Sequence, residues 1–148
     1  MNKYLVLLGD ESKPRGRRGE KQLSQMFWRD FFAEVCGVTD PLVAGIEFER
    51  GVRMRSNDIV GWIDVLWPQV VLIEHKSVGK NLDVAENEAR DYLISLEAKD
   101  RPPVIIVSDF LRILSSGGER GMTVANFRRA TKMKWRAVDD SFISTCGR

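Results

Sequence analysis

The chain has 148 residues, of which 43% are hydrophobic and 30% are charged, and its formal net charge is +2. This length fits one domain with a single core, and this composition excludes a chain that is disordered throughout. The longest uncharged apolar stretch, Trp67 to Ile73, is far shorter than the roughly 20 residues of a membrane-spanning helix, so we expect a cytoplasmic protein that does not bind a membrane.

Helical and strand-like patterns follow one another along the chain. Apolar residues recur every three or four positions over Glu20–Cys36 and Asn81–Leu96, which predicts a helix in each segment. Short β-branched or alternating runs predict strands, whereas no element is predicted in the glycine-rich segment Ser115–Gly121 or beyond it. In chain order we expect a short strand or arm (Lys3–Leu8), a helix (Glu20–Cys36), a strand within Val43–Arg55, a hairpin (Ile59–Trp67 and Val70–His75), a helix (Asn81–Leu96) and a strand (Val104–Val107).

The hairpin carries the charged residues that suggest chemistry. Glu74 and Lys76 end a nearly all-apolar strand that should be central in a sheet, where charged side chains are rarely buried without a partner. Residues two apart in a strand share a face, so Glu74 and Lys76 should point one way and His75 the other. If the turn takes the three residues 68–70, the antiparallel register puts Asp64 directly opposite Glu74.

Two carboxylates held this close repel each other unless a cation lies between them. Mg²⁺ accepts one or two protein carboxylates together with substrate phosphate oxygens, which Asp64 and Glu74 can offer. Lys76 can then orient or help to deprotonate the attacking water and stabilise the charge that develops in phosphodiester hydrolysis. The alternative is a structural ion-pair cluster in which Lys76 only pairs with Glu74 or Asp64. One histidine, and two cysteines without metal-ligand spacing, disfavour zinc sites and Ser-His or Cys-His hydrolases.

Segments spread over Glu20 to Ile113 carry a resemblance to a known family. These segments are Phe27-Trp28-Arg29-Asp30-Phe31-Phe32, Phe48-Glu49, Gly61 to Pro68, Leu72 to Ser77, Leu82 with Ala85, Ala89 with Asp91-Tyr92, and Pro103 to Phe110. The order of Asp64 and Glu74-His75-Lys76 resembles the PD-(D/E)XK nuclease superfamily. Taken together, the segments resemble the N-terminal nuclease domain of MmeI-like (type IIL) enzymes, which combine restriction and DNA methylation in one polypeptide.

The resemblance implies an α/β fold of the restriction-endonuclease-like type, with an αβββαβ core and a mixed sheet flanked by helices. It implies a Mg²⁺-dependent DNA endonuclease, in which Mn²⁺ can substitute. The implied catalytic residues are Asp64, Glu74 and Lys76, and the implied metal ligands are Asp64, Glu74, the backbone carbonyl of His75, and Glu20. A glutamate in the first turn of a helix also suits the helix dipole, so Glu20 has a structural explanation as well.

The sequence departs from the family in two respects. Relatives commonly carry a glutamine four residues before a tyrosine in the helix after the lysine strand, whereas this chain has Glu88 and Tyr92 as the accessory pair. A carboxylate there can repel a DNA phosphate or alter metal occupancy. The family continues into a methyltransferase and a target-recognition part, which this sequence lacks. The domain should therefore cut with little sequence preference, or require a homodimer or a separate methyltransferase or specificity partner.

Basic residues gather near both ends of the chain. Residues 112–148 hold eight basic and three acidic residues, and such clusters attract polyanions. They can equally solvate loops or a partly disordered remnant. We divide the chain into a nuclease-like core (1–113) and a basic C-terminal extension (114–148). The candidate DNA-binding residues are Arg15, Arg17, Arg18, Arg128, Arg129, Lys132 and Lys134.

Two tryptophans, Trp62 and Trp67, flank Asp64 in the predicted strand. Aromatic residues in strands usually bury their surface, so hydrophobic packing is favoured over base stacking.

Three functions remain open at this level. The first is a Mg²⁺-dependent restriction-type endonuclease. The second is a catalytically idle DNA-binding remnant or interaction module of a truncated restriction-modification gene, which Glu88 and the lack of a methyltransferase favour. The third is a nuclease that acts on branched or single-stranded nucleic acid.

Overall fold

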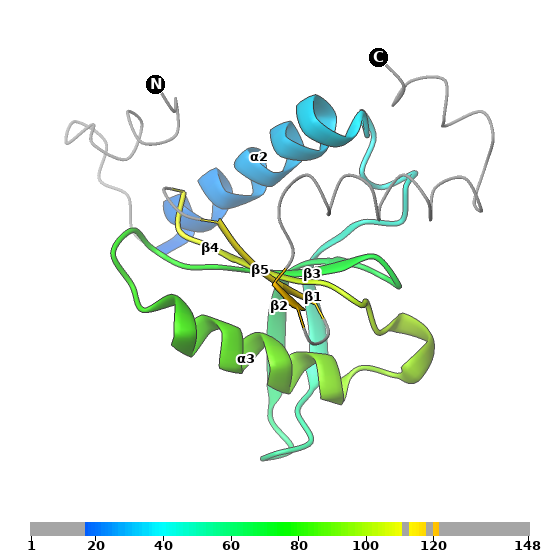
Figure 1. Cartoon of the computed structure of the whole chain (residues 1–148), viewed down its shortest axis with the longest axis vertical. Coiled ribbons are helices and arrows are strands. Elements are labelled where there is room, and N and C mark those ends of the chain that lie inside the picture. The colour runs from blue at the N-terminus through cyan, green and yellow to red at the C-terminus, as the bar shows by residue number, and fades with distance from the viewer. Residues whose placement is uncertain (1–16, 111–112, 118–119, 122–148) are drawn as a thin grey trace.

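The structure is a computed structural model that describes residues 17–110, 113–117 and 120–121. The described residues form a six-stranded sheet with a long helix on each face (Figure 1). In chain order the elements are α2 (Arg17–Cys36), β1 (Glu47–Arg53), β2 (Val60–Trp67), β3 (Val71–His75), α3 (Leu82–Ser95), the 3₁₀ helix η1 (Ala98–Asp100), β4 (Ile105–Ser108), β5 (Ile113–Gly117) and β6 (Arg120–Gly121).

The order from α2 to β4 confirms the expected αβββαβ core. The strands lie side by side in the order β1-β2-β3-β4-β5-β6. Neighbouring strands are antiparallel except β3 and β4, which are parallel because α3 forms the crossover between them. As predicted, β3 lies in the middle of the sheet and buries residues 71–74. No helix in the described part of the chain is long and apolar enough to cross a membrane.

Each face of the sheet has its own core, because residues of the central strands alternate between the two faces. Helix α2 covers one face and α3 covers the other (Figure 1). The α2-side core includes Trp28, Phe32, Cys36, Val65, Trp67, Val71, Ile73 and Ile106. The α3-side core includes Ile63, Leu66, Leu72, Leu82, Ala85, Ala89, Ile105 and Val107.

Helix α3 matches the prediction, since Asn81 and Leu96 are its caps. The Asn81 side chain accepts a hydrogen bond from the backbone N–H of Asp83 at 2.8 Å, which satisfies a donor that the first helical turn leaves free. We expect Asn81→Ala to lower the free energy of unfolding by about 1 kcal/mol, measured by urea denaturation. The matched control is Asn87→Ala, the same change at an exposed position inside α3. Equal effects of the two changes would contradict the capping role.

Two parts of the fold differ from the sequence prediction. Helix α2 begins at Arg17, one turn before Glu20. Strand β5 extends into the glycine-rich segment where no element was predicted, and its backbone pairs with β4 although serine and glycine are typical of turns. The open edge of β4 supplies the backbone partners, and such tertiary pairing overrides weak local propensity. The predicted Lys3–Leu8 arm lies outside the described residues.

Candidate active site at a fork between two strands

The β2–β3 hairpin has the predicted register. Trp67 pairs with Val71, so the turn takes three residues as expected, and the pairing continues to Val65 and Ile73. It stops there, although β2 begins at Val60 and β3 ends at His75. The next pair would be Asp64 and Glu74. The two strands therefore separate at the residues predicted to carry the chemistry.

The separation is accompanied by a break in the face alternation of β2. Ile63 and Leu66 both lie in the α3-side core, whereas Val65 lies in the α2-side core. Residues three apart share a face only if the pleat is interrupted between them. Glu49, which the β1–β2 register places opposite Asp64, has a φ of 53°, outside the strand region. The interruption frees the Asp64 carboxylate to accept a hydrogen bond from the backbone N–H of His75 at 2.7 Å.

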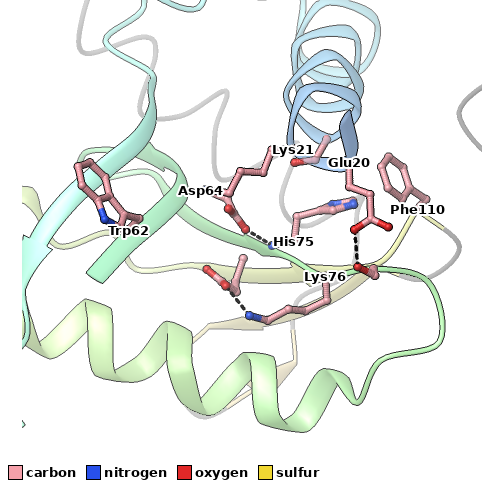
Figure 2. A pocket seen from close by; sticks show the side chains of 10 residues that line it. Glu20, Lys21, Trp62, Asp64, His75, Lys76 and Phe110 are labelled. Carbon is pink, nitrogen blue, oxygen red and sulfur yellow. Dashed lines mark hydrogen bonds and ion pairs between the residues drawn. The ribbon is translucent and has the colours of Figure 1, made fainter. Parts of the chain in front are cut away.

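The fork opens into a cavity of about 270 Å³ (Figure 2). Its walls come from the first turns of α2, from β2, from the end of β3 and its following residues, and from Phe110 after β4. Segments that are far apart in sequence thus meet at one point. The lining residues are Glu20, Lys21, Ser24, Trp62, Asp64, Glu74, His75, Lys76, Ser77 and Phe110.

Asp64 and Glu74 are buried acids that influence each other. Desolvation raises the pKa of Asp64 to about 6, and the hydrogen bond from His75 opposes that shift. Desolvation, followed by the charge of Asp64, raises the pKa of Glu74 to about 8. Glu74 is only 4% exposed, and its Oε2 has no hydrogen-bond partner among the residues that the structure describes. A buried acceptor without a partner is costly, so this oxygen is suited to a cation or to a proton.

Lys76 shares its ammonium between two acids on different elements. Its Nζ donates to Glu74 Oε1 at 2.8 Å and also to Glu88 Oε2 on α3. Burial would lower the pKa of Lys76, but the charges of Glu74 and Glu88 and the hydrogen bonds to them outweigh it and raise that pKa. Glu74 and Lys76 therefore lie on one side of the strand, as the two-residue spacing predicted, and Lys76 is protonated.

His75 points to the opposite side, also as predicted. The indole N–H of Trp28 donates to His75 Nδ1 at 3.1 Å, and the imidazole packs edge-on against Phe110. Burial lowers the pKa of His75 to about 4, so the ring is neutral and its proton lies on Nε2. These contacts hold the end of β3 against α2, which fixes the backbone between Glu74 and Lys76.

Glu20 and Tyr92 also lie near the fork. Glu20 lines the cavity and accepts a hydrogen bond from the hydroxyl of Ser77 at 2.8 Å (Figure 2). The Tyr92 ring lies over Gly61, where an added Cβ would be 2.5 Å from its Cε1. Burial, and then the charges of Glu74 and Glu88, raise the pKa of Tyr92.

Most of the candidate DNA-binding residues lie outside the part of the chain that the structure describes. Arg17 and Arg18 belong to the first turn of α2, the helix whose Glu20 and Lys21 line the cavity. The other candidates, Arg15, Arg128, Arg129, Lys132 and Lys134, lie outside the described residues.

Sequence reasoning missed five of the residues that line the cavity, which are Lys21, Ser24, Trp62, Ser77 and Phe110. Lys21 lines the cavity and forms an ion pair with Glu49 at 2.7 Å. Trp62 is 55% exposed at the cavity, whereas Trp67 is 6% exposed in the α2-side core. The packing prediction is therefore confirmed for Trp67 and wrong for Trp62. The spacing of Trp62 and Asp64, two residues apart on one strand, was the signal that could have placed them together.

Asp64 and Glu74 are two acids that could act as metal ligands in the cavity. Among the described residues, no group of three or more His, Cys, Asp or Glu side chains is arranged to hold a metal ion. Asp64 and Glu74, whose Oε2 has no partner within the described part of the chain, suit Mg²⁺, which keeps several waters and takes one or two protein carboxylates. Glu20 and the His75 carbonyl stay predicted ligands.

Comparisons with known proteins give one result. No curated protein and no solved structure matches this chain. Residues 8–127 match the family model described as MmeI, N-terminal domain. The match covers most of the 148 residues and includes every residue that lines the cavity. The chain therefore belongs to the MmeI N-terminal domain family, which relates it to restriction enzymes.

Proposed function

We propose that this chain is a Mg²⁺-dependent DNA endonuclease domain of the PD-(D/E)XK type, a restriction-type deoxyribonuclease. The observation that carries the proposal is the pair of buried acids, Asp64 and Glu74, at a strand fork beside the protonated Lys76. Membership of the MmeI N-terminal domain family supports it. In this proposal the substrate is DNA. Recognition of a target sequence then depends on a homodimer or on a separate methyltransferase or specificity partner.

The donor chemistry of the fork fits a hard divalent cation. Asp64 and Glu74 would hold Mg²⁺ together with the His75 carbonyl, and Glu20 approaches from α2. Bound there, the ion would supply Lewis acidity toward the phosphate and lower the pKa of a water. The pKa values of both acids are raised because burial disfavours their charged forms more than Lys76 and the hydrogen bonds favour them, and a bound cation would offset that cost.

The remaining groups act on the phosphodiester. In hydrolysis, a water oxygen bonds to phosphorus while the bond from phosphorus to the sugar oxygen breaks, and a phosphate monoester and a hydroxyl remain. Negative charge gathers on the phosphate oxygens in the transition state, and the ammonium of Lys76 can stabilise it. Because Lys76 is protonated, it acts as a hydrogen-bond donor and a positive charge, and it does not serve as the base.

The direct test is cleavage by the purified chain. Supercoiled plasmid, linear duplex, branched and single-stranded DNA are each incubated with Mg²⁺, Mn²⁺, Ca²⁺ or EDTA. We expect phosphodiester cleavage with Mg²⁺ and Mn²⁺, and none in EDTA. Cleavage that EDTA does not reduce, or intact DNA on every substrate with both metals, would contradict the proposal.

A second candidate function, an idle DNA-binding module, is favoured by the ion pair between Lys76 and Glu88. The Glu88 carboxylate accepts a hydrogen bond from the Lys76 ammonium and adds a negative charge beside it. If the site is active, we expect Glu88→Gln to raise the cleavage rate by about three- to tenfold, because the amide can still accept from Lys76 but carries no charge.

The control for this variant is Glu86→Gln on the same helix, whose carboxylate pairs with Arg90. This control should cleave at the wild-type rate. If wild type and Glu88→Gln bind DNA in a salt-dependent manner and neither cleaves it, the idle module is the better description.

A further inference from the structure

Ser77 lines the cavity, yet the proposed hydrolysis gives it no role. It follows Lys76, just past the end of β3, and its hydroxyl donates a hydrogen bond to Glu20 Oε2 at 2.8 Å. Glu20 belongs to the first turn of α2 and also lines the cavity (Figure 2). The hydrogen bond therefore joins two walls of the cavity that come from different elements.

The backbone on both sides of Ser77 is held in place. The N–H of Lys76 donates to the carbonyl of Ser108 on β4 at 2.7 Å, and the N–H of Lys80 donates to the carbonyl of Ser77 at 3.2 Å. The alternation of β3 also continues past its last residue, since Ser77 points toward α2 as His75 does, two residues earlier. The strand thus presents a hydroxyl donor to α2 at a fixed point.

The Glu20 side chain has more freedom than the hydroxyl that binds it. Trp28, further along α2, donates to His75, so the helix itself is fixed against the end of β3. A half-buried glutamate on a fixed helix still has several rotamers, and ordering it costs side-chain entropy. The hydrogen bond from Ser77 favours one of these rotamers. It uses Oε2 and leaves Oε1 able to interact with a cation.

We propose that Ser77 is a positioning residue, whose hydroxyl holds the Glu20 carboxylate in the orientation that acts on the divalent cation of the fork. This inference rests on the proposed function for the presence of the cation. Mg²⁺ keeps several of its waters, so Glu20 can act on the ion directly or through one of them. Loss of a partner that orients a metal-binding side chain typically lowers metal affinity by about ten- to a hundredfold. The alternative is a purely structural hydrogen bond that ties α2 to the sheet.

The test is Mn²⁺ binding to the purified chain without DNA, measured from the electron paramagnetic resonance signal of free Mn²⁺. Ser77→Ala removes the hydroxyl, whereas Ser77→Thr keeps it. We expect the dissociation constant for Mn²⁺ to rise about tenfold in Ser77→Ala and less than about threefold in Ser77→Thr. The matched control is Ser56→Ala, the same change at an exposed serine between β1 and β2, which should bind Mn²⁺ as wild type does.

A double-mutant cycle separates positioning from the structural alternative. Glu20→Gln removes the charge that attracts a cation, but its amide oxygen can still accept from Ser77. If Ser77 acts through that charge, adding Ser77→Ala to Glu20→Gln leaves Mn²⁺ affinity unchanged. An equal loss in both backgrounds, or wild-type Mn²⁺ affinity in the single variant Ser77→Ala, overturns the inference. Thermal melting by circular dichroism checks that each variant is folded.

The inference and the proposed nuclease can fail separately. If the chain cleaves DNA but Ser77→Ala binds Mn²⁺ as tightly as wild type, the nuclease stands and the positioning role is wrong. If Mn²⁺ affinity depends on Ser77 through Glu20 but no DNA is cleaved, the positioning role stands and the nuclease is wrong. A wild-type chain that binds no Mn²⁺ overturns the positioning role, and the cleavage test then decides on the nuclease alone.

Discussion

Asp64→Asn should lower Mg²⁺-dependent DNA cleavage by about a thousandfold. Asparagine has nearly the same shape, and its side-chain oxygen can still accept the backbone N–H of His75, which the aspartate accepts at 2.7 Å. The fork should therefore keep its geometry. What the change removes is the negative charge that the proposed cation requires. The measurement is the initial rate of plasmid nicking by the purified variant with saturating Mg²⁺.

The matched control is Asp83→Asn, the same chemical change at an exposed position in the first turn of α3. It should cleave as wild type does, because Asp83 is not among the residues that line the cavity. Melting temperatures of both variants show whether the fold is intact. A folded Asp64→Asn protein with the wild-type rate would remove Asp64 from the active site.

Glu74→Gln should stabilise the metal-free protein at alkaline pH, and this is the second large effect. The pKa of Glu74 is raised from 4.5 to about 8 and that of Asp64 from 3.8 to about 6, mainly by desolvation. The folded state thus holds protons that the unfolded chain has released. The stability that these bound protons give the folded state is complete below about pH 4. It is lost as the pH rises through the folded-state pKa values, about 6 for Asp64 and about 8 for Glu74. Glutamine removes the contribution of Glu74 to this loss.

We expect the unfolding free energy of wild type in EDTA to fall between about pH 5 and pH 8, and that of Glu74→Gln to fall less. At pH 8 the variant should be more stable by about 2 kcal/mol. Added Mg²⁺ should stabilise wild type and leave the variant nearly unchanged, because ligand binding stabilises only a state that binds the ligand. Urea denaturation at each pH measures this.

Glu97→Gln serves as the control, since Glu97 has an exposed carboxylate that pairs with Lys99 near η1. Its pH profile should follow that of wild type. If Glu74→Gln and Glu97→Gln had the same profile as wild type over the whole range, the carboxyl group of Glu74 would titrate normally, and its burial would carry no electrostatic cost.

Much of the site follows from strand periodicity. The three-residue turn and the alternation of β3 were enough to predict which side Glu74, Lys76 and His75 occupy, and the register that leads to Asp64. These features are local, because they depend on residues within one hairpin. The αβββαβ order was predictable for the same reason, since each element has its own apolar pattern.

Features that depend on distant contacts were not predictable. The left-handed backbone of Glu49 lies on β1, opposite Asp64 in the register, and nothing in the local sequence marks that residue. Trp62 is exposed because the α2-side core ends before it, although its sequence environment resembles that of the buried Trp67. Strand β5 depends on the free edge of β4, which only the assembled sheet provides.

The contact between Tyr92 and Gly61 has a mechanical consequence. Helix α3 rests on β2 through this ring, and the absence of a side chain at Gly61 sets how closely the helix can approach. Glu88 lies one turn earlier on the same helix and reaches Lys76 from it. A methyl group at residue 61 would press on the Tyr92 ring, so the glycine favours the close approach of the helix that carries Glu88 toward Lys76.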